Sequence, residues 1–185
     1  MSTVAHRDSV SVQDAPSVGK NLAGKYLTFG LAREVYGLEI LKVQEIIGIM
    51  AVTHVPRMPS FVRGVINLRG RIIPVIDLRT QFGLPCQEDT PKTCIIVMQI
   101  RRGDHSVTMG ILVDEVAEGI DLRAEQIEPA PSFGTAVNTD FILGMGKVGQ
   151  KVIMLLDIDR VLAAEEVTQV EQAQVEQAQI EQVQP

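Results

Sequence analysis

Aromatic residues and cysteines are scarce in this chain of 185 residues. Aromatic side chains make up 4% of it and tryptophan is absent, which leaves few rings on which nucleic-acid bases could stack. The two cysteines, Cys86 and Cys94, form no CxxC motif and have no histidine at metal-ligand spacing. The sequence therefore indicates neither a zinc site nor a disulfide framework.

Long apolar runs are also missing. No segment approaches the roughly 18 consecutive apolar residues that a membrane-spanning helix needs, and the first residues lack the basic-then-apolar pattern of a signal peptide. With 45% hydrophobic and 22% charged residues, the chain can still bury a substantial core. We expect a soluble intracellular protein of one domain or two small ones.

Two segments each lack one sign of charge: the first has no basic residue and the second has no acidic residue. Residues 161–185 contain five glutamates and no lysine or arginine, so the rest of the chain is close to neutral. Between Ile46 and Val75 there is no acidic residue, but there are four arginines: Arg57, Arg63, Arg69 and Arg71. These arginines form either a solvated basic face or a surface that holds carboxylates of a partner. The overall balance argues against a nucleic-acid-binding footprint.

Alternating apolar residues predict short strands in the first half of the chain. Residues 25–40 alternate in two runs around a polar break, which predicts a β-hairpin, and residues 40–47 fit the spacing of a short helical turn. A second hairpin is predicted over residues 63–78, folded about Gly70. Pro74 lacks an N–H group, so its strand lies at a sheet edge or begins a new pairing there.

The second half repeats this pattern of short strands, which favours a mainly β fold of two small barrels with short helices. We expect the first barrel at about 24–85 and the second at about 93–158, closed by a short helix at 158–164. A flexible leader, 1–23, precedes them. The tail, 165–185, repeats VEQAQ, a five-residue period that places its apolar residues on no single helical face.

Motifs for catalysis are weak. A GxGxxG pattern from Gly144 to Gly149 precedes a predicted strand rather than a helix, so we interpret it as a hairpin turn and not as a phosphate site. The three histidines, His6, His54 and His105, are scattered, and there is no GxSxG motif. We expect no enzyme, cofactor or metal. A small-molecule enzyme and a nucleic-acid-binding barrel remain as alternative function classes.

Three motifs follow one another in a specific order: YGLEILKVQEI at 36–46, PSFVRGVINLRG at 59–70 and IPVIDLR at 73–79. Together with GILVDEV at 110–116, they resemble the CheW family of bacterial chemotaxis coupling proteins, over about residues 24–164. The resemblance implies two five-stranded, SH3-like barrels with a hydrophobic groove between them, and no catalysis.

The same resemblance implies partners. CheW-like proteins are adaptors that connect the cytoplasmic signalling tips of transmembrane chemoreceptors to the regulatory domain of the histidine kinase CheA. We therefore expect a scaffold of a two-component signalling array, located in the cytoplasm at membrane-associated and often polar arrays. Neither nucleic acid binding nor direct insertion into the membrane is expected.

The resemblance also suggests site residues. Arg69 falls on the family's signature arginine, and Glu45 falls on an acidic position associated with receptor contact; we expect the two side chains to pair. Further residues fall on positions that look like receptor-face or groove positions in the family: Val43, Gly64, Ile95, Gly110 and Gly144. The alternatives are that the two apolar residues are core and that the three glycines serve only backbone geometry.

Overall fold

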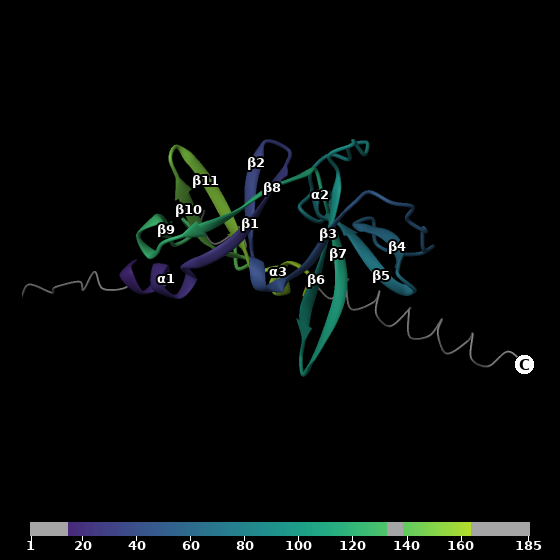
Figure 1. The fold of residues 1–185 in the computed structure, drawn as a ribbon, viewed down its shortest axis with the longest axis horizontal. Helices are drawn as coiled ribbons and strands as arrows, with labels where there is room; N and C mark the ends of the chain where they lie inside the picture. The colour runs from purple at the N-terminus through teal and green to yellow at the C-terminus, as the bar shows by residue number, and fades with distance from the viewer. Residues whose placement is uncertain (1–14, 133–138, 164–185) are drawn as a thin grey trace, which may run out of the picture.

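The computed structural model describes residues 15–132 and 139–163. Short strands dominate these residues, with a few helical turns between them (Figure 1). In chain order the elements are α1 (Ala15–Leu22), β1 (Gly24–Leu31), β2 (Glu34–Glu39), the 3₁₀ turn η1 (Ile40–Lys42), β3 (Val43–Gly48), β4 (Val62–Leu68), β5 (Arg71–Asp77), α2 (Leu78–Gln81), β6 (Cys94–Arg102), β7 (His105–Val113), β8 (Glu115–Leu122), the 3₁₀ turn η2 (Ala124–Gln126), β9 (Ile127–Glu128), β10 (Ile142–Val148), β11 (Lys151–Leu156) and α3 (Ile158–Val161).

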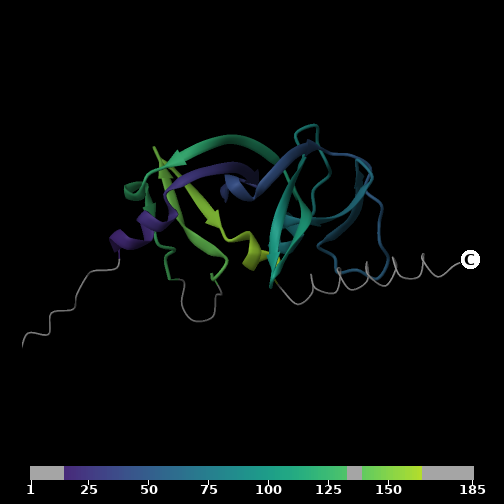
Figure 2. The same cartoon turned by 60° about the horizontal axis from the view of Figure 1, so that its bottom comes forward.

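The strands of the described residues form two sheets. The six-stranded sheet has the order β8-β1-β2-β11-β10-β9, and the five-stranded sheet has the order β3-β6-β7-β5-β4. The two groups lie side by side, and the turned view shows them from a second direction (Figures 1 and 2). The mainly β fold predicted from the sequence is confirmed. None of the helices in the described ranges has the length and apolar character that a membrane-spanning helix needs.

The strands are not divided between the sheets as we expected. The first hairpin, β1–β2, joins β8 to β11, and β6–β7 join β3 to β5. Four pairings produce this exchange: the antiparallel pairs β1–β8 and β3–β6 and the parallel pairs β2–β11 and β5–β7. In the parallel pairs Tyr36 of β2 lies opposite Met154 of β11, and Ile76 of β5 lies opposite Ile111 of β7. Neither sheet is therefore built from a single consecutive stretch such as 24–85 or 93–158. Alternation reveals a local hairpin, but it does not reveal which distant hairpin it pairs with.

Pro74 determines where one of these parallel pairings begins. In the antiparallel pair with β4 it lies opposite Val65, whereas the parallel pairing with β7 begins at Val75, opposite Gly110. Because proline cannot donate a ladder hydrogen bond, the second pairing begins one residue later. Of the two outcomes expected from the sequence, a sheet edge or the start of a new pairing, the structure shows the second.

Three apolar clusters hold the fold together. The largest lies between the two sheets and contains buried residues of both, such as Phe29 and Leu38 from the six-stranded sheet and Met98 and Ile111 from the five-stranded sheet. A second cluster belongs to the five-stranded sheet and a third to the six-stranded sheet. The space between the sheets is thus filled by a shared core.

Two local expectations need correction. Residues 15–22, expected to belong to a flexible leader, form α1, which packs against η2; a Cβ on Gly19 would lie 2.2 Å from the Ala124 carbonyl oxygen. Residues 40–47 form only the short turn η1 and then strand β3, whose residues alternate between half-buried and exposed positions. The helix-like spacing of apolar residues arises because the exposed position 46 holds an isoleucine and the half-buried position 45 a glutamate. The rest of the leader and the tail, 165–185, lie outside the described residues.

Candidate partner-binding surface

Glu45 and Arg69 form an ion pair, as the sequence analysis proposed. Glu45 lies on β3 and Arg69 in the turn between β4 and β5. In the hydrogen-bonding order of the five-stranded sheet, β3 and β4 are the two outermost strands. The pair therefore connects the two ends of the sheet order, which requires that the sheet curl until its edges face each other.

Arg69 occupies an unfavourable backbone conformation for its residue type. The turn has two residues, Arg69 with φ 53° and Gly70 with φ 85°, and positive values at both positions are typical of a type I′ turn. Asparagine followed by glycine is the preferred sequence there, whereas a left-handed conformation costs most other residues about 1–2 kcal/mol. The Arg69 side chain is 70% exposed. The turn alone does not explain why an arginine stands at this position.

Ile95 and Gly110 lie together beneath this surface, but they are buried. Ile95 is fully buried in the cluster of the five-stranded sheet. A Cβ on Gly110 would lie 2.7 Å from Ile95 Cγ2, so the glycine leaves space for the isoleucine. Val43, half-buried, packs against the shared core. Ile95 is therefore a core residue, the alternative that its apolar side chain left open.

The two remaining glycines lie apart from each other. Gly64 is in β4 with φ 143°, and a Cβ there would lie 2.1 Å from the Thr53 carbonyl oxygen, because Thr53 and Val65 exchange two backbone hydrogen bonds of 2.8 and 2.9 Å. Gly144 is in β10 of the six-stranded sheet, where a Cβ would lie 2.9 Å from the Glu128 carbonyl oxygen. The structure places Gly64 in the same sheet as Glu45 and Arg69, but not Gly144.

The arginine-rich window is mostly engaged within the molecule. Arg63 binds Asp89 at 2.6 Å and lies 3.8 Å from Asp77. Arg71 donates to the Thr108 hydroxyl at 3.1 Å, and Arg69 pairs with Glu45. Three of the four arginines of the window thus have a polar partner within the molecule, although Arg57, Arg69 and Arg71 are exposed.

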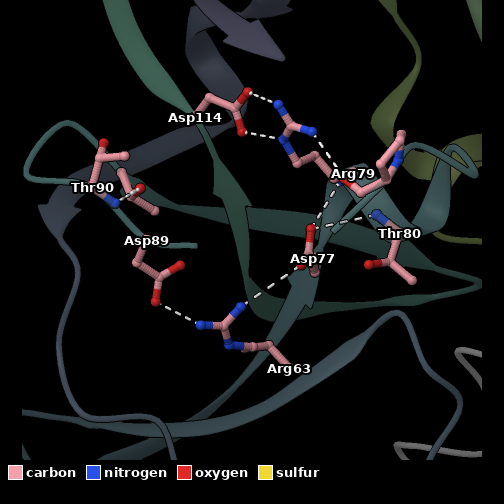
Figure 3. A network of polar contacts seen from close by, with 9 residues as sticks. Arg63, Asp77, Arg79, Thr80, Asp89, Thr90 and Asp114 are labelled. Carbon is pink, nitrogen blue, oxygen red and sulfur yellow. Dashed lines mark hydrogen bonds and ion pairs between the residues drawn. The ribbon is translucent and has the colours of Figure 1, made fainter. Parts of the chain in front are cut away.

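A second polar cluster, around Arg79 and Asp114, was not found from the sequence. Arg79 Nε and Nη2 donate to the two oxygens of Asp114 at 2.6 and 2.7 Å, and Figure 3 shows these two contacts side by side. Asp77 accepts from the Arg79 and Thr80 amides and thereby caps α2. Asp77, directly before a short apolar run, could have been recognised as a helix cap, but no local signal connects Arg79 with Asp114.

The Arg79 contacts shift the titration of Asp114. Burial by itself would raise the pKa of the Asp114 carboxyl group, but the hydrogen bonds from Arg79 and from the Ala32 amide outweigh it and lower the pKa below its ordinary value. The hydrogen bond with Asp114 raises the pKa of Arg79 in turn. The pair is therefore charged at neutral pH.

An apolar hollow of about 390 Å³ lies beside the first strand. Leu22, Tyr26 and Ile40 contribute to its lining, and Leu41 beside them is 96% exposed. Burial, with a smaller effect of Glu39, raises the pKa of Tyr26 to about 12, and the Tyr26 hydroxyl donates to the Leu22 carbonyl oxygen at 2.5 Å. Within the described ranges there is no group of three His, Cys, Asp or Glu residues that could hold a metal ion.

Comparisons with known proteins show which family the sequence and the fold resemble. The family model for the CheW-like domain matches residues 25–166. The chain is 39% identical to the chemotaxis protein CheW of Klebsiella aerogenes, over 83% of this chain and 90% of that protein, and 33% identical to CheW of Bacillus subtilis, over 76% and 88%. The crystal structure of the scaffolding protein TtCheW from Thermoanaerobacter tengcongensis matches with a TM-score of 0.68 at 35% identity, covering 78% of this chain and 96% of that one.

The chain belongs to the CheW family. It is thus a non-catalytic scaffold or adaptor protein of chemotaxis. The CheW assignment itself does not assign roles to individual residues.

Replacement of Arg69 by asparagine separates turn stability from the ion pair. Arg69→Asn creates the preferred turn sequence and removes an exposed pair that contributes at most about 1 kcal/mol. We expect the free energy of unfolding, measured by urea denaturation, to stay the same or rise by up to about 1 kcal/mol. Arg69→Ala, which loses the pair without improving the turn, should be less stable than Arg69→Asn. A loss of several kcal/mol in Arg69→Asn would contradict this account of the turn.

Replacement of Asp114 by asparagine should give a pH-dependent loss of stability. Because the folded-state pKa is lowered, the carboxylate stabilises the fold above the unfolded value of about 3.8, and this contribution disappears as the pH falls through the lower folded value. Asp114→Asn should cost about 2 kcal/mol near neutral pH, the magnitude of hydrogen bonds to a charged group. Denaturation of both proteins between pH 7 and pH 2 should show the difference shrinking in acid, whereas a constant difference would contradict the assignment.

Proposed function

We propose that this protein couples chemoreceptors to the histidine kinase CheA. In this proposal it binds the cytoplasmic signalling tip of the receptors and the regulatory domain of CheA, and it works in the cytoplasm at receptor arrays. Membership of the CheW family supports this function, since the resemblance of the sequence motifs implies these two partners. No contact with nucleic acid and no insertion into the membrane form part of the proposal.

The observation that carries the proposal is the exposed Arg69–Glu45 pair. Arg69 stays in a left-handed turn conformation although asparagine would suit the turn better. Backbone strain of this kind is found at functional sites, where the side chain has a role beyond folding. We propose that Arg69 and Glu45 contact the receptor directly, with the arginine supplying the planar donor set that a carboxylate on a partner can accept.

The other predicted residues then act in different ways. Val43 lies two residues from Glu45 on β3, and we propose that it borders the contact. Ile95, Gly110 and Gly64 set the shape of the sheet beneath it, since each is packed tightly against a neighbouring strand or loop. Gly144 belongs to the six-stranded sheet, so we propose for it no shared contact with Arg69.

A titration of both partners tests the proposal. The full chain should bind an isolated receptor signalling tip and the isolated CheA regulatory domain, both measured by calorimetry. Arg69→Asn, which preserves the turn, should weaken receptor binding about tenfold, equivalent to about 1.4 kcal/mol. Binding of the kinase domain should change much less.

The control removes an equal charge elsewhere. Arg33 is exposed in the turn between β1 and β2, in the other sheet, and Arg33→Asn should leave receptor binding unchanged. If Arg69→Asn and Arg33→Asn weaken receptor binding equally, Arg69 contributes only through the net charge of the protein and not through a specific contact. Absence of binding to both partners would overturn the proposed function.

A further inference from the structure

The chain passes between the two sheets at two places within the described residues. It leaves the six-stranded sheet after β2, through η1, and enters the five-stranded sheet at β3. It returns after β7, through Asp114, to β8. A carboxylate contacts each of these crossings. The Asp114 carboxylate contacts elements of both sheets, whereas the Asp159 carboxylate, which follows the last strand of the six-stranded sheet, contacts the crossing segment and the five-stranded sheet.

At the return crossing, the carboxylate is that of Asp114. It accepts two hydrogen bonds from Arg79, which follows β5 of the five-stranded sheet. It also accepts from the Ala32 amide at 2.7 Å, in the turn between β1 and β2 of the six-stranded sheet. The Asp114 amide donates to the Gly30 carbonyl oxygen of β1 at 3.1 Å. One residue thus binds both sheets.

At the first crossing, Asp159 has the corresponding role. Asp159 lies on α3, directly after the last strand of the six-stranded sheet. One oxygen pairs with Lys42 of η1, and the other accepts from the Arg101 amide of β6 at 2.9 Å. The Asp159 carboxylate therefore joins the crossing segment to the five-stranded sheet.

The end of α3 is held from the same side. The side-chain amide of Gln81 donates through Nε2 to the Val161 carbonyl oxygen at 3.2 Å, and the Arg102 guanidinium donates to the Leu162 carbonyl oxygen. Both donors belong to the part of the chain that carries the five-stranded sheet. Helix α3, which follows β11, is consequently docked onto the neighbouring sheet.

These contacts differ in kind from the apolar core that they flank. Burial of apolar surface favours contact between the sheets but is non-directional. Charged hydrogen bonds, and a two-bond arginine–carboxylate pair above all, prescribe both distance and angle. The carboxylates therefore add directional constraints on the angle between the sheets to those of the packed core.

We infer that Asp114 and Asp159 are positioning residues that hold the two sheets at one relative orientation, so that an event at the Glu45–Arg69 surface is transmitted to the six-stranded sheet. The second half of this inference rests on the proposed coupling function, whereas the first half concerns the protein alone. Loss of both carboxylates leaves the shared core in place but widens the range of angles that the two sheets adopt.

The orientation is measurable by electron paramagnetic resonance between two spin labels. In a chain carrying Cys86→Ser and Cys94→Ser, labels are placed on cysteines that replace Lys151, at the tip of the six-stranded sheet, and His105, at the tip of the β6–β7 hairpin; both side chains are exposed. The parent should give one narrow distance distribution. Asp114→Asn combined with Asp159→Asn should broaden it, and each single replacement should broaden it less.

A matched control removes an ion pair that lies within one sheet region. Asp89 binds Arg63, and both belong to the part of the chain that forms the five-stranded sheet. Asp89→Asn should leave the distance distribution narrow. If the double replacement does not fold, the single replacements decide the matter. Unchanged distributions in folded single and double variants would overturn the positioning role.

Reconstituted signalling tests whether the fixed orientation transmits an event at the Glu45–Arg69 surface. In assemblies of receptor tip, CheA and this protein, the double variant should bind each partner within about twofold of the parent but lose the receptor-dependent change in kinase activity. Full kinase control despite a broadened distribution would overturn the transmission claim. If the parent chain binds neither partner, the proposed function fails, but the distance measurement still decides whether the carboxylates fix the orientation.

Discussion

The shared apolar core between the sheets is the constraint on which the rest of the structure depends. Strands β1 and β2 supply Phe29 and Tyr36, whose rings stack at 5.7 Å, and the row of rings continues through Phe82 to Phe141. Phe82 follows α2 on the five-stranded side, and Phe141 precedes β10 on the other. In a chain with 4% aromatic residues, four of these rings form one row across the junction. Neither sheet can bury this surface without its neighbour.

Charged side chains around this core form two kinds of contact, one between the sheets and one at the exposed surface. The Asp114 carboxylate contacts both sheets, and that of Asp159 connects the end of the six-stranded sheet to the first crossing and to β6, while Glu45 and Arg69 meet at the edges of the five-stranded sheet. The exposed pair contributes little to folding, because solvent screens it, and the turn that carries Arg69 is strained. The contacts between the sheets and the exposed pair for which we propose a role in recognition thus involve different residues.

The sequence predicts the local parts of this arrangement better than the distant ones. Both N-terminal hairpins and the pairing change at Pro74 follow from alternation and from the missing N–H group. The exchange of strands between sheets and the Arg79–Asp114 pair depend on contacts between segments far apart, and no local pattern encodes them. The contact between Glu45 and Arg69 was expected from family resemblance alone. Burial of Ile95 could not be separated from exposure, since apolar residues suit both a core and an interface.

A double-mutant cycle on Glu45 and Arg69, read as affinity for a receptor signalling tip, tests the central claim most directly. Glu45→Gln, Arg69→Asn and the combination would be compared with the parent. If the two side chains act as one unit, the double variant binds about as weakly as either single variant, with a coupling of at least about 1 kcal/mol. Losses that simply add would show that the residues act independently, and unchanged affinity in all three variants would contradict the assigned surface.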